Sequence, residues 1–401
     1  MPRTLDLLVD RVDLSPADLP AVPMHALYVH VPFCFHKCHY CDFYSITRQT
    51  PERMERFVDL LLAEAALWRN VRPKPATVFF GGGTPSLLPL NAMRRLIEGL
   101  HDVFDLTAVD EWTIEVNPAT ADAEYLKMLR ATGVNRLSFR AQSFDGSELR
   151  TLERHHSPSD VDRSVQIAAD AGFERLNLDL IYAIPGQTLA SWQRSLDRAL
   201  GLGTSHLSCY GLTYEPNTVI AVRRRLGQLY PVEDDVELTM LHAARRVLRS
   251  HGMSPYEISN YARDAEECRH NLAYWTGKNY VGLGPSAASH VEGHRFKNRQ
   301  HLGDWESAVP TGKLPVVEHE FLSPHQRMEE RVMLELRLAR GVRWSDYSAD
   351  LRGVYAGQLQ QLAGLGLVAV DAAGFRLTEK GVDVADGVAG QFVLGESASA
   401  D

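Results

Sequence analysis

Three of the five cysteines stand within eight residues of one another, at Cys34, Cys38 and Cys41. Thiolates are soft ligands that suit zinc or iron–sulfur centres. A structural zinc ion takes four protein ligands, and His36 or His39 is placed to supply the fourth. A [4Fe–4S] cluster normally takes four cysteines, so three would leave one iron with an open position for a small molecule. This spacing favours an iron–sulfur cluster over zinc and over simple packing.

The cysteines directly follow an apolar run, 26–33, that is typical of a β-strand. Further strands are expected over 77–82, 111–118, 135–144, 175–186 and 206–216. Helices are expected between and after them, over 52–69, 91–104, 122–132, 158–171, 188–201 and 233–251. Strands that alternate with helices predict βα units and a parallel sheet, and six units fit a partial barrel or an open sheet. The cysteines therefore lie at the carboxyl end of the first strand, where α/β proteins gather their ligands.

The pattern divides the chain into four segments. Residues 1–22 are an N-terminal extension, 23–255 hold the βα units, 256–322 are a loop-rich connection, and 323–395 form a C-terminal domain. In the last segment, helical runs are followed by a hairpin that turns at 371–374. Helices followed by a short hairpin resemble a winged helix.

Composition limits the classes of function. The 401 residues include 42 basic and 51 acidic side chains, for a formal net charge of −9, and no Lys/Arg-rich recognition segment, so nucleic-acid binding is not expected. The longest apolar run, 57–68, contains Asp59 and Glu64, so no integral membrane segment is expected. Acidic residues stand where a signal peptide needs an apolar core, and five cysteines are too few for a disulfide framework. We expect a cytoplasmic protein.

The C-x3-C-x2-C spacing, with an aromatic residue before the last cysteine, resembles the radical S-adenosylmethionine (SAM) superfamily. In that family the amino and carboxylate groups of SAM chelate the open iron. One electron from the reduced cluster then cleaves the sulfonium to give methionine and a 5′-deoxyadenosyl radical. The resemblance implies an α/β fold, namely a partial (β/α)6 barrel with a C-terminal winged-helix-like small domain. It also implies a [4Fe–4S] cluster on the three cysteines, SAM, and a flavodoxin- or ferredoxin-type electron donor.

The same resemblance suggests which residues contact SAM. A glycine run, Gly81–Gly83, follows the second strand, where the family holds the methionyl end of SAM, although a tight turn alone would also explain it. Asp179 lies among apolar residues of a strand, where a carboxylate is costly unless paired, and ribose hydroxyls are suitable partners. Arg154 could bind the SAM carboxylate or a substrate acid, or lie on the surface. The expected SAM contacts are Tyr28, Tyr40, Gly83, Thr84, Glu115, Gln142, Arg154 and Asp179.

Several phrases resemble the oxygen-independent coproporphyrinogen III oxidase branch, among them YVHVPFC, FFGGGTPS and NLDLIYAIPGQT. True oxidases carry an extra cysteine two residues beyond the third cluster ligand, where this chain has Phe43. Haem chaperones of the HemW type instead have an H-N-x-x-Y-W motif, which is present at 270–275. His270 would then be an axial ligand of haem iron, with Tyr274 and Trp275 stacked on the macrocycle. An aromatic cluster that packs the small domain against the barrel is the alternative explanation of this motif.

The resemblance therefore implies a haem chaperone of the HemW type, which delivers haem to acceptor proteins, with respiratory proteins among the candidates. Two alternatives use the same scaffold: an oxidase that converts coproporphyrinogen III to protoporphyrinogen IX, and a methyltransferase that binds two SAM molecules. A zinc-stabilised structural or DNA-binding protein is an alternative of another class. Two residues depart from the family pattern, Arg140 and Glu153, where glycines are usual. From the sequence, Arg140 could point into the SAM pocket or outward to solvent.

Overall fold

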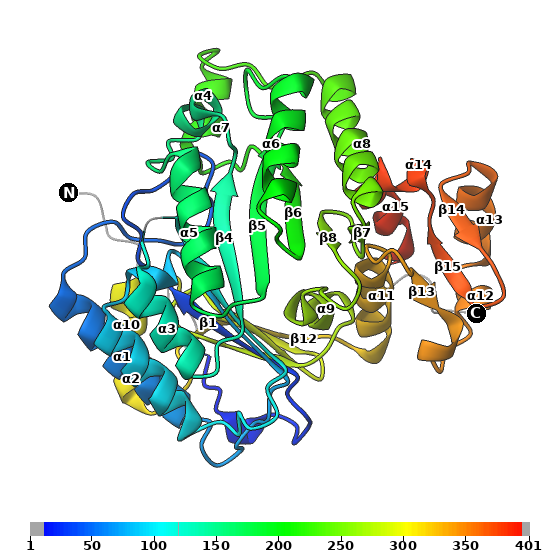
Figure 1. Ribbon diagram of the computed structural model, residues 1–401. Coiled ribbons are helices and arrows are strands. Elements are labelled where there is room, and N and C mark those ends of the chain that lie inside the picture. Colours follow the sequence, from blue (N-terminus) through cyan, green and yellow to red (C-terminus); the bar gives the residue numbers. More distant parts are fainter. Residues whose placement is uncertain (1–11, 119, 395–401) are drawn as a thin grey trace, which may run out of the picture.

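Six parallel strands form the centre of the molecule and follow one another in chain order. The computed structural model describes residues 12–118 and 120–394. The six strands are β1 (Ala26–Val31), β2 (Thr77–Gly82), β3 (Glu111–Val116), β4 (Arg136–Gln142), β5 (Arg175–Tyr182) and β6 (His206–Gly211). Because the strands are parallel, the loops after them gather at one edge of the sheet (Figure 1). The predicted sheet of six βα units is confirmed.

Amphipathic helices alternate with these strands and cover one face of the sheet (Figure 1). They are α1 (Pro51–Ala66), α2 (Leu90–His101), α3 (Ala123–Ala131), α5 (Pro158–Asp170), α6 (Leu189–Gly201) and α8 (Asp234–Ser250). In α1, Phe57, Leu61 and Ala65 are buried, at the four-residue spacing that places side chains on one helix face. The short helices α4 (Gly146–Thr151) and α7 (Val219–Arg225) were not expected from the sequence. None of the described helices is long and apolar enough to cross a membrane.

Residues 256–322, expected as a loop-rich connection, extend the sheet instead. At one edge β8 (Asn260–Ala262) continues it antiparallel beyond β6 and pairs in turn with β7 (Ser254–Pro255), which immediately precedes this segment. At the other edge β9 (Tyr280–Leu283) pairs parallel with β1, and β10 (Ala288–Val291), β11 (His294–Asn298) and β12 (Val316–Phe321) follow antiparallel. Within the described residues the sheet therefore has twelve strands, in the order β12-β11-β10-β9-β1-β2-β3-β4-β5-β6-β8-β7. These added strands are short and rich in polar residues, so they lack the clear apolar pattern by which a strand is recognised.

A buried carboxylate joins this extension to α1. Glu64 is fully buried and accepts hydrogen bonds from Gly284 N at 2.9 Å, Asn298 Nδ2 at 2.6 Å and Trp305 Nε1 at 2.9 Å. Burial raises the pKa of Glu64 to about 7, and the three donors oppose that rise. Trp305 belongs to α10 (Leu302–Ala308), whose packing against α1 continues the hydrophobic core of the barrel. The barrel and the extension are thus one packed unit.

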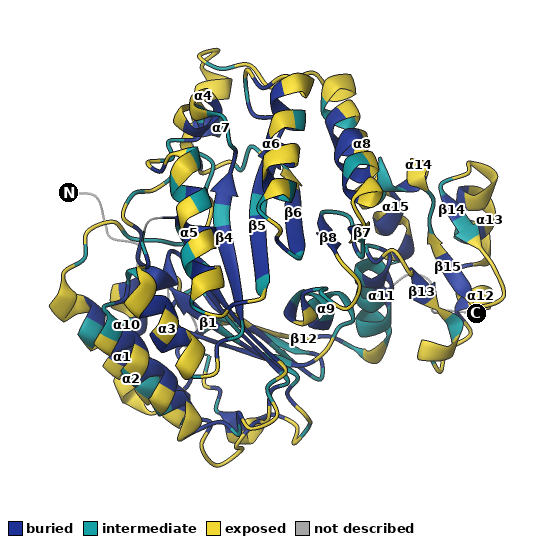
Figure 2. Cartoon of the chain, viewed as in Figure 1, coloured by how far each residue is buried: buried dark blue, intermediate teal, exposed yellow. Residues whose placement is uncertain are grey.

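The C-terminal domain has a core of its own. Its elements are α11 (Pro324–Glu335), β13 (Val342–Arg343), α12 (Leu351–Val354), α13 (Ala356–Gly364), β14 (Val368–Val370), β15 (Gly374–Leu377), α14 (Glu379–Val382) and α15 (Ala385–Ala389). Its core includes Val332, Tyr355, Phe375 and Phe392, and the buried residues lie on the inner faces of these elements (Figure 2). The expected hairpin turn is confirmed, because Asp371 N donates to Gly374 O at 2.9 Å. The order of helices and strands is that of the winged-helix-like domain predicted from the sequence.

Candidate functional site

The three clustered cysteines lie on the loop that follows β1, which we call the cysteine loop (residues 32–46). Two backbone hydrogen bonds close its base: Cys34 N donates to Ile46 O at 2.9 Å, and Ile46 N donates to Pro32 O at 2.8 Å. A turn in which Cys41 N donates to Cys38 O at 3.2 Å holds the second and third cysteines close together. Cys34 is buried, whereas Cys38 and Cys41 are half-buried. The structure therefore places all three expected ligands on one loop at the carboxyl edge of the sheet.

The spacing of donor atoms argues against a single zinc ion on these cysteines. A tetrahedral zinc with Zn–S bonds of about 2.3 Å holds its sulfurs about 3.8 Å apart. Among the described His, Cys, Asp and Glu residues, one trio has all its donor atoms within 4.8 Å of one another, and it is His36, Glu153 and His155. His39 Nε2 lies 3.7 Å from Glu153 Oε2, so both candidate histidines face Glu153. The three thiols are not gathered as closely as the ligands of one zinc ion, and three cysteines on one loop fit the ligand type of an iron–sulfur cluster.

The two remaining cysteines lie elsewhere. Cys209 on β6 is buried in the hydrophobic core, and burial raises the pKa of its thiol. Cys268 donates to Glu111 Oε1 at 3.3 Å, and burial raises its pKa to about 12. Both thiols are therefore protonated and engaged in the interior, and neither supplies a fourth ligand.

The glycine run packs directly against the cysteine loop. Gly83 N donates to Val31 O at 2.8 Å, and Thr84 N donates to Phe33 O at 2.6 Å. A Cβ atom added to Gly82 would lie 2.5 Å from an imidazole ring, and one added to Gly83 would lie 2.6 Å from Phe33 O. Gly82 also has a φ of +100°, which glycine adopts without strain. The run therefore lets two backbones approach closely and turns the carbonyls of Gly82 and Gly83 toward the site.

Those two carbonyls are occupied by Arg140 from β4. Its guanidinium donates to Gly83 O at 2.8 Å and Gly82 O at 3.1 Å, and it forms an ion pair with Glu115 of β3. The guanidinium carbon also lies 5.9 Å from the centre of the Phe43 ring. Burial raises the pKa of Glu115 to about 7, although Arg140 opposes that rise. Arg140 therefore points into the site, where its guanidinium is bound by two backbone carbonyls and a carboxylate.

A second arginine reaches the thiols. Arg154 Nη1 donates to Cys38 Sγ at 3.4 Å, and Arg154 Nη2 donates to the backbone oxygen of Arg140 at 2.8 Å and to Asn117 Oδ1. Arg154 is thus a partner of the cysteine loop and not a surface residue.

Three neighbouring residues complete this region. Thr84 Oγ1 lies 3.8 Å from Cys34 Sγ. Glu153 has a φ of +55°, in the left-handed region that favours glycine, so the backbone keeps the shape that the usual glycine would give. Asn117 was not predicted from the sequence as a site residue. Its position two residues after Glu115 could have indicated it, because alternate residues of an extended chain face the same side.

Half of the expected SAM contacts line one cavity. This first chamber, of about 1320 Å³, lies over β3 to β6 and is bounded by residues 382–387 of the C-terminal domain. Its walls include Tyr40, Cys41, Glu115, Gln142 and Asp179. The Asp179 carboxylate accepts hydrogen bonds from Asn177 Nδ2 at 2.8 Å and from Ser138 Oγ at 3.4 Å. This partly buried carboxylate is therefore stabilised by protein donors while it faces the chamber.

A second cavity adjoins the first. The second chamber, of about 1140 Å³, lies over β1, β9, β10 and β11 and is covered by α11. Tyr28, which was expected to contact SAM, lines this second chamber and not the first. Asp42 and Phe43 of the cysteine loop line both chambers, and Phe43 is 60% exposed. The cysteine loop therefore stands where the two chambers meet.

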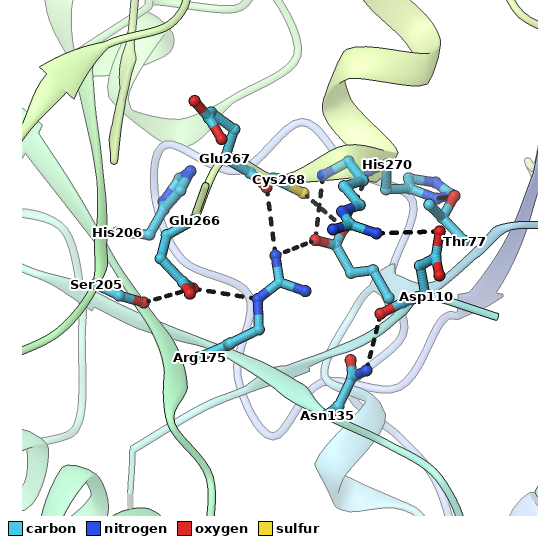
Figure 3. Close-up of polar contacts among 12 residues, drawn as sticks. Thr77, Asp110, Asn135, Arg175, Ser205, His206, Glu266, Glu267, Cys268 and His270 are labelled. Carbon is cyan, nitrogen blue, oxygen red and sulfur yellow. Dashed lines mark hydrogen bonds and ion pairs between the residues drawn. The ribbon is translucent and has the colours of Figure 1, made fainter. Parts of the chain in front are cut away.

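The H-N-x-x-Y-W motif lies on a short helix, α9 (Arg269–Trp275), whose first turn is held by a buried carboxylate (Figure 3). Glu111, at the start of β3, accepts hydrogen bonds from Arg269 N at 3.1 Å and His270 N at 3.0 Å. Arg175 forms an ion pair with the same carboxylate at 2.9 Å. A negative charge at a helix N-terminus satisfies free N–H groups, so Glu111 fixes the position of the motif.

Both ring nitrogens of His270 are already engaged by the protein. Nδ1 lies 2.9 Å from Thr77 Oγ1, and Nε2 lies 2.9 Å from the Tyr274 hydroxyl. The ring is buried and stacks on Phe79 with centroids 5.1 Å apart. Thr77 begins β2 and the glycine run ends it, so His270 lies about 16 Å along the strand from that run. In this structure His270 is a residue of the interior at the amino edge of the sheet, away from the cysteines.

The other motif residues point to different surroundings. Asn271 lines the first chamber and Tyr274 lines the second. The Trp275 ring lies 4.6 Å from the guanidinium carbon of Arg337, which follows α11. The motif therefore contributes to the walls of both chambers and also contacts the C-terminal domain.

Three thiols after the first strand of a six-stranded partial barrel, with a glycine run on the neighbouring strand, define a radical SAM protein. Comparison with family models agrees. The Radical SAM superfamily model matches residues 28–199, and the HemN C-terminal domain model matches residues 322–384. Membership of the radical SAM superfamily implies a [4Fe–4S] cluster and SAM.

Comparison with curated proteins is more specific. Heme chaperone HemW of Bacillus subtilis is 33% identical over 93% of this chain and 100% of its own length. Heme chaperone HemW of Escherichia coli is 36% identical over 67% of this chain and 71% of its own length. This chain belongs to the HemW family of radical SAM proteins. Coproporphyrinogen III oxidase (HemN) from Escherichia coli shares the fold, with a TM-score of 0.81 and 24% identity over 93% of this chain and 91% of that structure.

Proposed function

We propose that this chain is a haem chaperone, which binds haem and delivers it to an acceptor protein. The observation that carries the proposal is Phe43, which stands where an oxidase of the same scaffold has an extra cysteine. This ring is 60% exposed and faces both chambers, so it offers an apolar surface to a planar ligand and no thiol for oxidative chemistry. The name of the matching relatives supports the same function.

The chain's own residues would hold two cofactors beside the haem. Cys34, Cys38 and Cys41 would bind the [4Fe–4S] cluster, with Arg154 donating a hydrogen bond to Cys38 Sγ. When bound, the reduced cluster supplies one electron and SAM supplies the sulfonium that accepts it. The residues proposed to hold SAM in the first chamber are Tyr40, Glu115, Gln142 and Asp179, with Gly83 and Thr84 at the glycine run. A flavodoxin- or ferredoxin-type protein is the proposed electron donor.

Replacing Arg140 by glycine should strengthen SAM binding by roughly thirtyfold, because it releases two carbonyls that are each worth about 1 kcal/mol. Its guanidinium occupies the carbonyls of Gly82 and Gly83, where the family holds the methionyl end of SAM. Equilibrium dialysis of reconstituted protein against SAM measures the change. Asp179→Ala removes a carboxylate of the first chamber and should weaken binding instead. Weaker binding by R140G would mean that the guanidinium itself helps to hold SAM.

Incubation with haem and with coproporphyrinogen III side by side tests the proposed function. We expect stoichiometric haem binding, seen in the Soret absorption, and no protoporphyrinogen IX in the presence of SAM and reductant. His270→Ala should weaken haem binding without loss of iron–sulfur content, because the motif lies at the amino edge of the sheet and the cysteines at the carboxyl edge. Formation of protoporphyrinogen IX, with haem affinity unaffected by His270→Ala, would favour the oxidase.

A further inference from the structure

We infer that the haem site is the second chamber, with His25 as the ligand to iron and Lys278 and Lys297 facing the propionates. The inference rests on the proposed function and adds where haem binds and which residues bind it. It assigns to His270 a positioning role in place of direct ligation.

The second chamber has the size and the walls that a tetrapyrrole needs. Its volume of about 1140 Å³ lies just above the range of roughly 300–1,000 Å³ that small-molecule sites span, so it has room for a large ligand. Tyr28, Tyr274 and Tyr280 line it from β1, α9 and β9. The rings of Tyr274 and Tyr280 meet edge to face with centroids 4.7 Å apart. Aromatic walls of this kind suit a large, flat, apolar ligand.

Four imidazoles line the chamber, and their hydrogen bonds distinguish one of them. His30 has both ring nitrogens near protein oxygens, at 3.1 and 3.0 Å. His290 Nε2 accepts a backbone hydrogen bond at 3.2 Å, and His325 Nδ1 lies 3.7 Å from a carboxylate oxygen. His25 has a buried Nδ1 without a partner, and no described residue forms a hydrogen bond with either of its ring nitrogens. His25 and His325 are thus the two imidazoles of the chamber without a hydrogen bond from a described residue, and His25 is the one of the two that has no carboxylate beside it, so we assign His25 as the iron ligand.

The position of His25 places it beside the aromatic wall. It immediately precedes β1, in which Ala26 pairs with Tyr280 of β9. Burial and the charge of Lys278 hold the pKa of His25 below its ordinary value. Its place just before β1 therefore sets His25 beside Tyr280 and Lys278 in the wall of the second chamber.

Two cations of the chamber lack an acidic partner. Lys278 and Lys297 form no ion pair with any described carboxylate, whereas Arg295 and Arg327 are paired with Glu330 and Glu292 across the boundary between the sheet and α11. Haem carries two propionate groups, which need cationic or hydrogen-bonding partners once they leave water. The two unpaired lysines supply that charge.

The same geometry explains why His270 would matter without touching the iron. Its Nε2 lies 2.9 Å from the hydroxyl of Tyr274, and Tyr274 lines the second chamber. His270→Ala would release Tyr274 from this position and so lower haem affinity. Because the iron ligand would be unchanged, the Soret maximum of bound haem should stay where it is in the wild-type protein.

Three porphyrins separate these roles: ferric haem, metal-free protoporphyrin IX, and haem dimethyl ester, whose propionates carry no charge. Each is titrated into the reconstituted full chain by absorption. His25→Ala should weaken haem binding by roughly tenfold or more and shift the Soret maximum, but leave protoporphyrin IX binding unchanged. Lys297→Ala should weaken haem and protoporphyrin IX but not the dimethyl ester. The matched controls are His251→Ala and Lys127→Ala, which change exposed residues outside both chambers.

The outcomes distinguish the site from the function. If wild-type protein binds no haem, the proposed function fails and the site fails with it. If haem binds and both His25→Ala and Lys297→Ala match the wild type with all three porphyrins, the function stands and the second chamber is not its site. A shift of the Soret maximum in His270→Ala, with no shift in His25→Ala, would identify His270 as the iron ligand and overturn the assignment of His25.

Discussion

Replacing Cys38 by alanine should yield colourless protein with little iron, whereas wild-type protein purified without oxygen should be brown and hold about four irons per chain. Two thiolates cannot hold the cluster, and Cys38 is the thiol that shares a turn with Cys41 and accepts a hydrogen bond from Arg154. Iron and sulfide analysis measures the loss. Visible absorption that bleaches with dithionite should be present in the wild type and absent from the variant.

The matched control is Cys209→Ala. Its thiol lies in the core on β6, away from the cysteine loop, so the variant should keep wild-type iron and colour. Colourless wild-type protein with one zinc would contradict the iron–sulfur assignment. Loss of iron in Cys209→Ala together with normal folding would show that a fourth cysteine takes part.

Replacing Glu111 by alanine should lower the free energy of unfolding by about 3–5 kcal/mol, the range for breaking a buried ion pair. The carboxylate is fully buried and holds Arg175, Cys268 and the first turn of α9 (Figure 3). Its removal leaves the partly buried Arg175 with Glu266 as its remaining carboxylate partner, and leaves two backbone N–H groups without their acceptor. Chemical denaturation of the reconstituted protein, followed by circular dichroism, gives the change.

The control is Glu266→Ala, because Glu266 pairs with the same arginine at 3.2 Å but is 31% exposed. Glu266→Ala should lower the free energy of unfolding by about 1 kcal/mol or less. Burial pushes the pKa of Glu111 up, but Arg136, Arg175 and the backbone donors bring it below the ordinary value of 4.5. The difference between wild type and Glu111→Ala should therefore be full above pH 4.5 and shrink as the pH falls through the lowered pKa. Equal losses in both variants would contradict the role given to Glu111.

The sequence by itself determined the barrel and the place of the cysteines. Strands buried in a parallel sheet are nearly continuous apolar runs, and the helices between them bury one face, so both patterns are local. The order of strands and helices then sets the cysteines at the carboxyl end of β1 without any knowledge of distant contacts. The hairpin turn at 371–374 was predictable for the same reason, since Asp371 accepts hydrogen bonds from the next backbone N–H groups.

The tertiary structure alone decided what surrounds the cysteines. The strands that complete the sheet are short and polar where they face the second chamber, and β9 finds its partner β1 across most of the chain. His270 lies within hydrogen-bond distance of Thr77, although the two residues are 193 positions apart in the sequence. Arg140 points inward because Glu115 and the carbonyls of Gly82 and Gly83 bind its guanidinium there. Spacing along a chain fixes which residues share an element, because backbone geometry is local. It does not fix which distant groups satisfy a buried charge or imidazole, because that partner is chosen by packing.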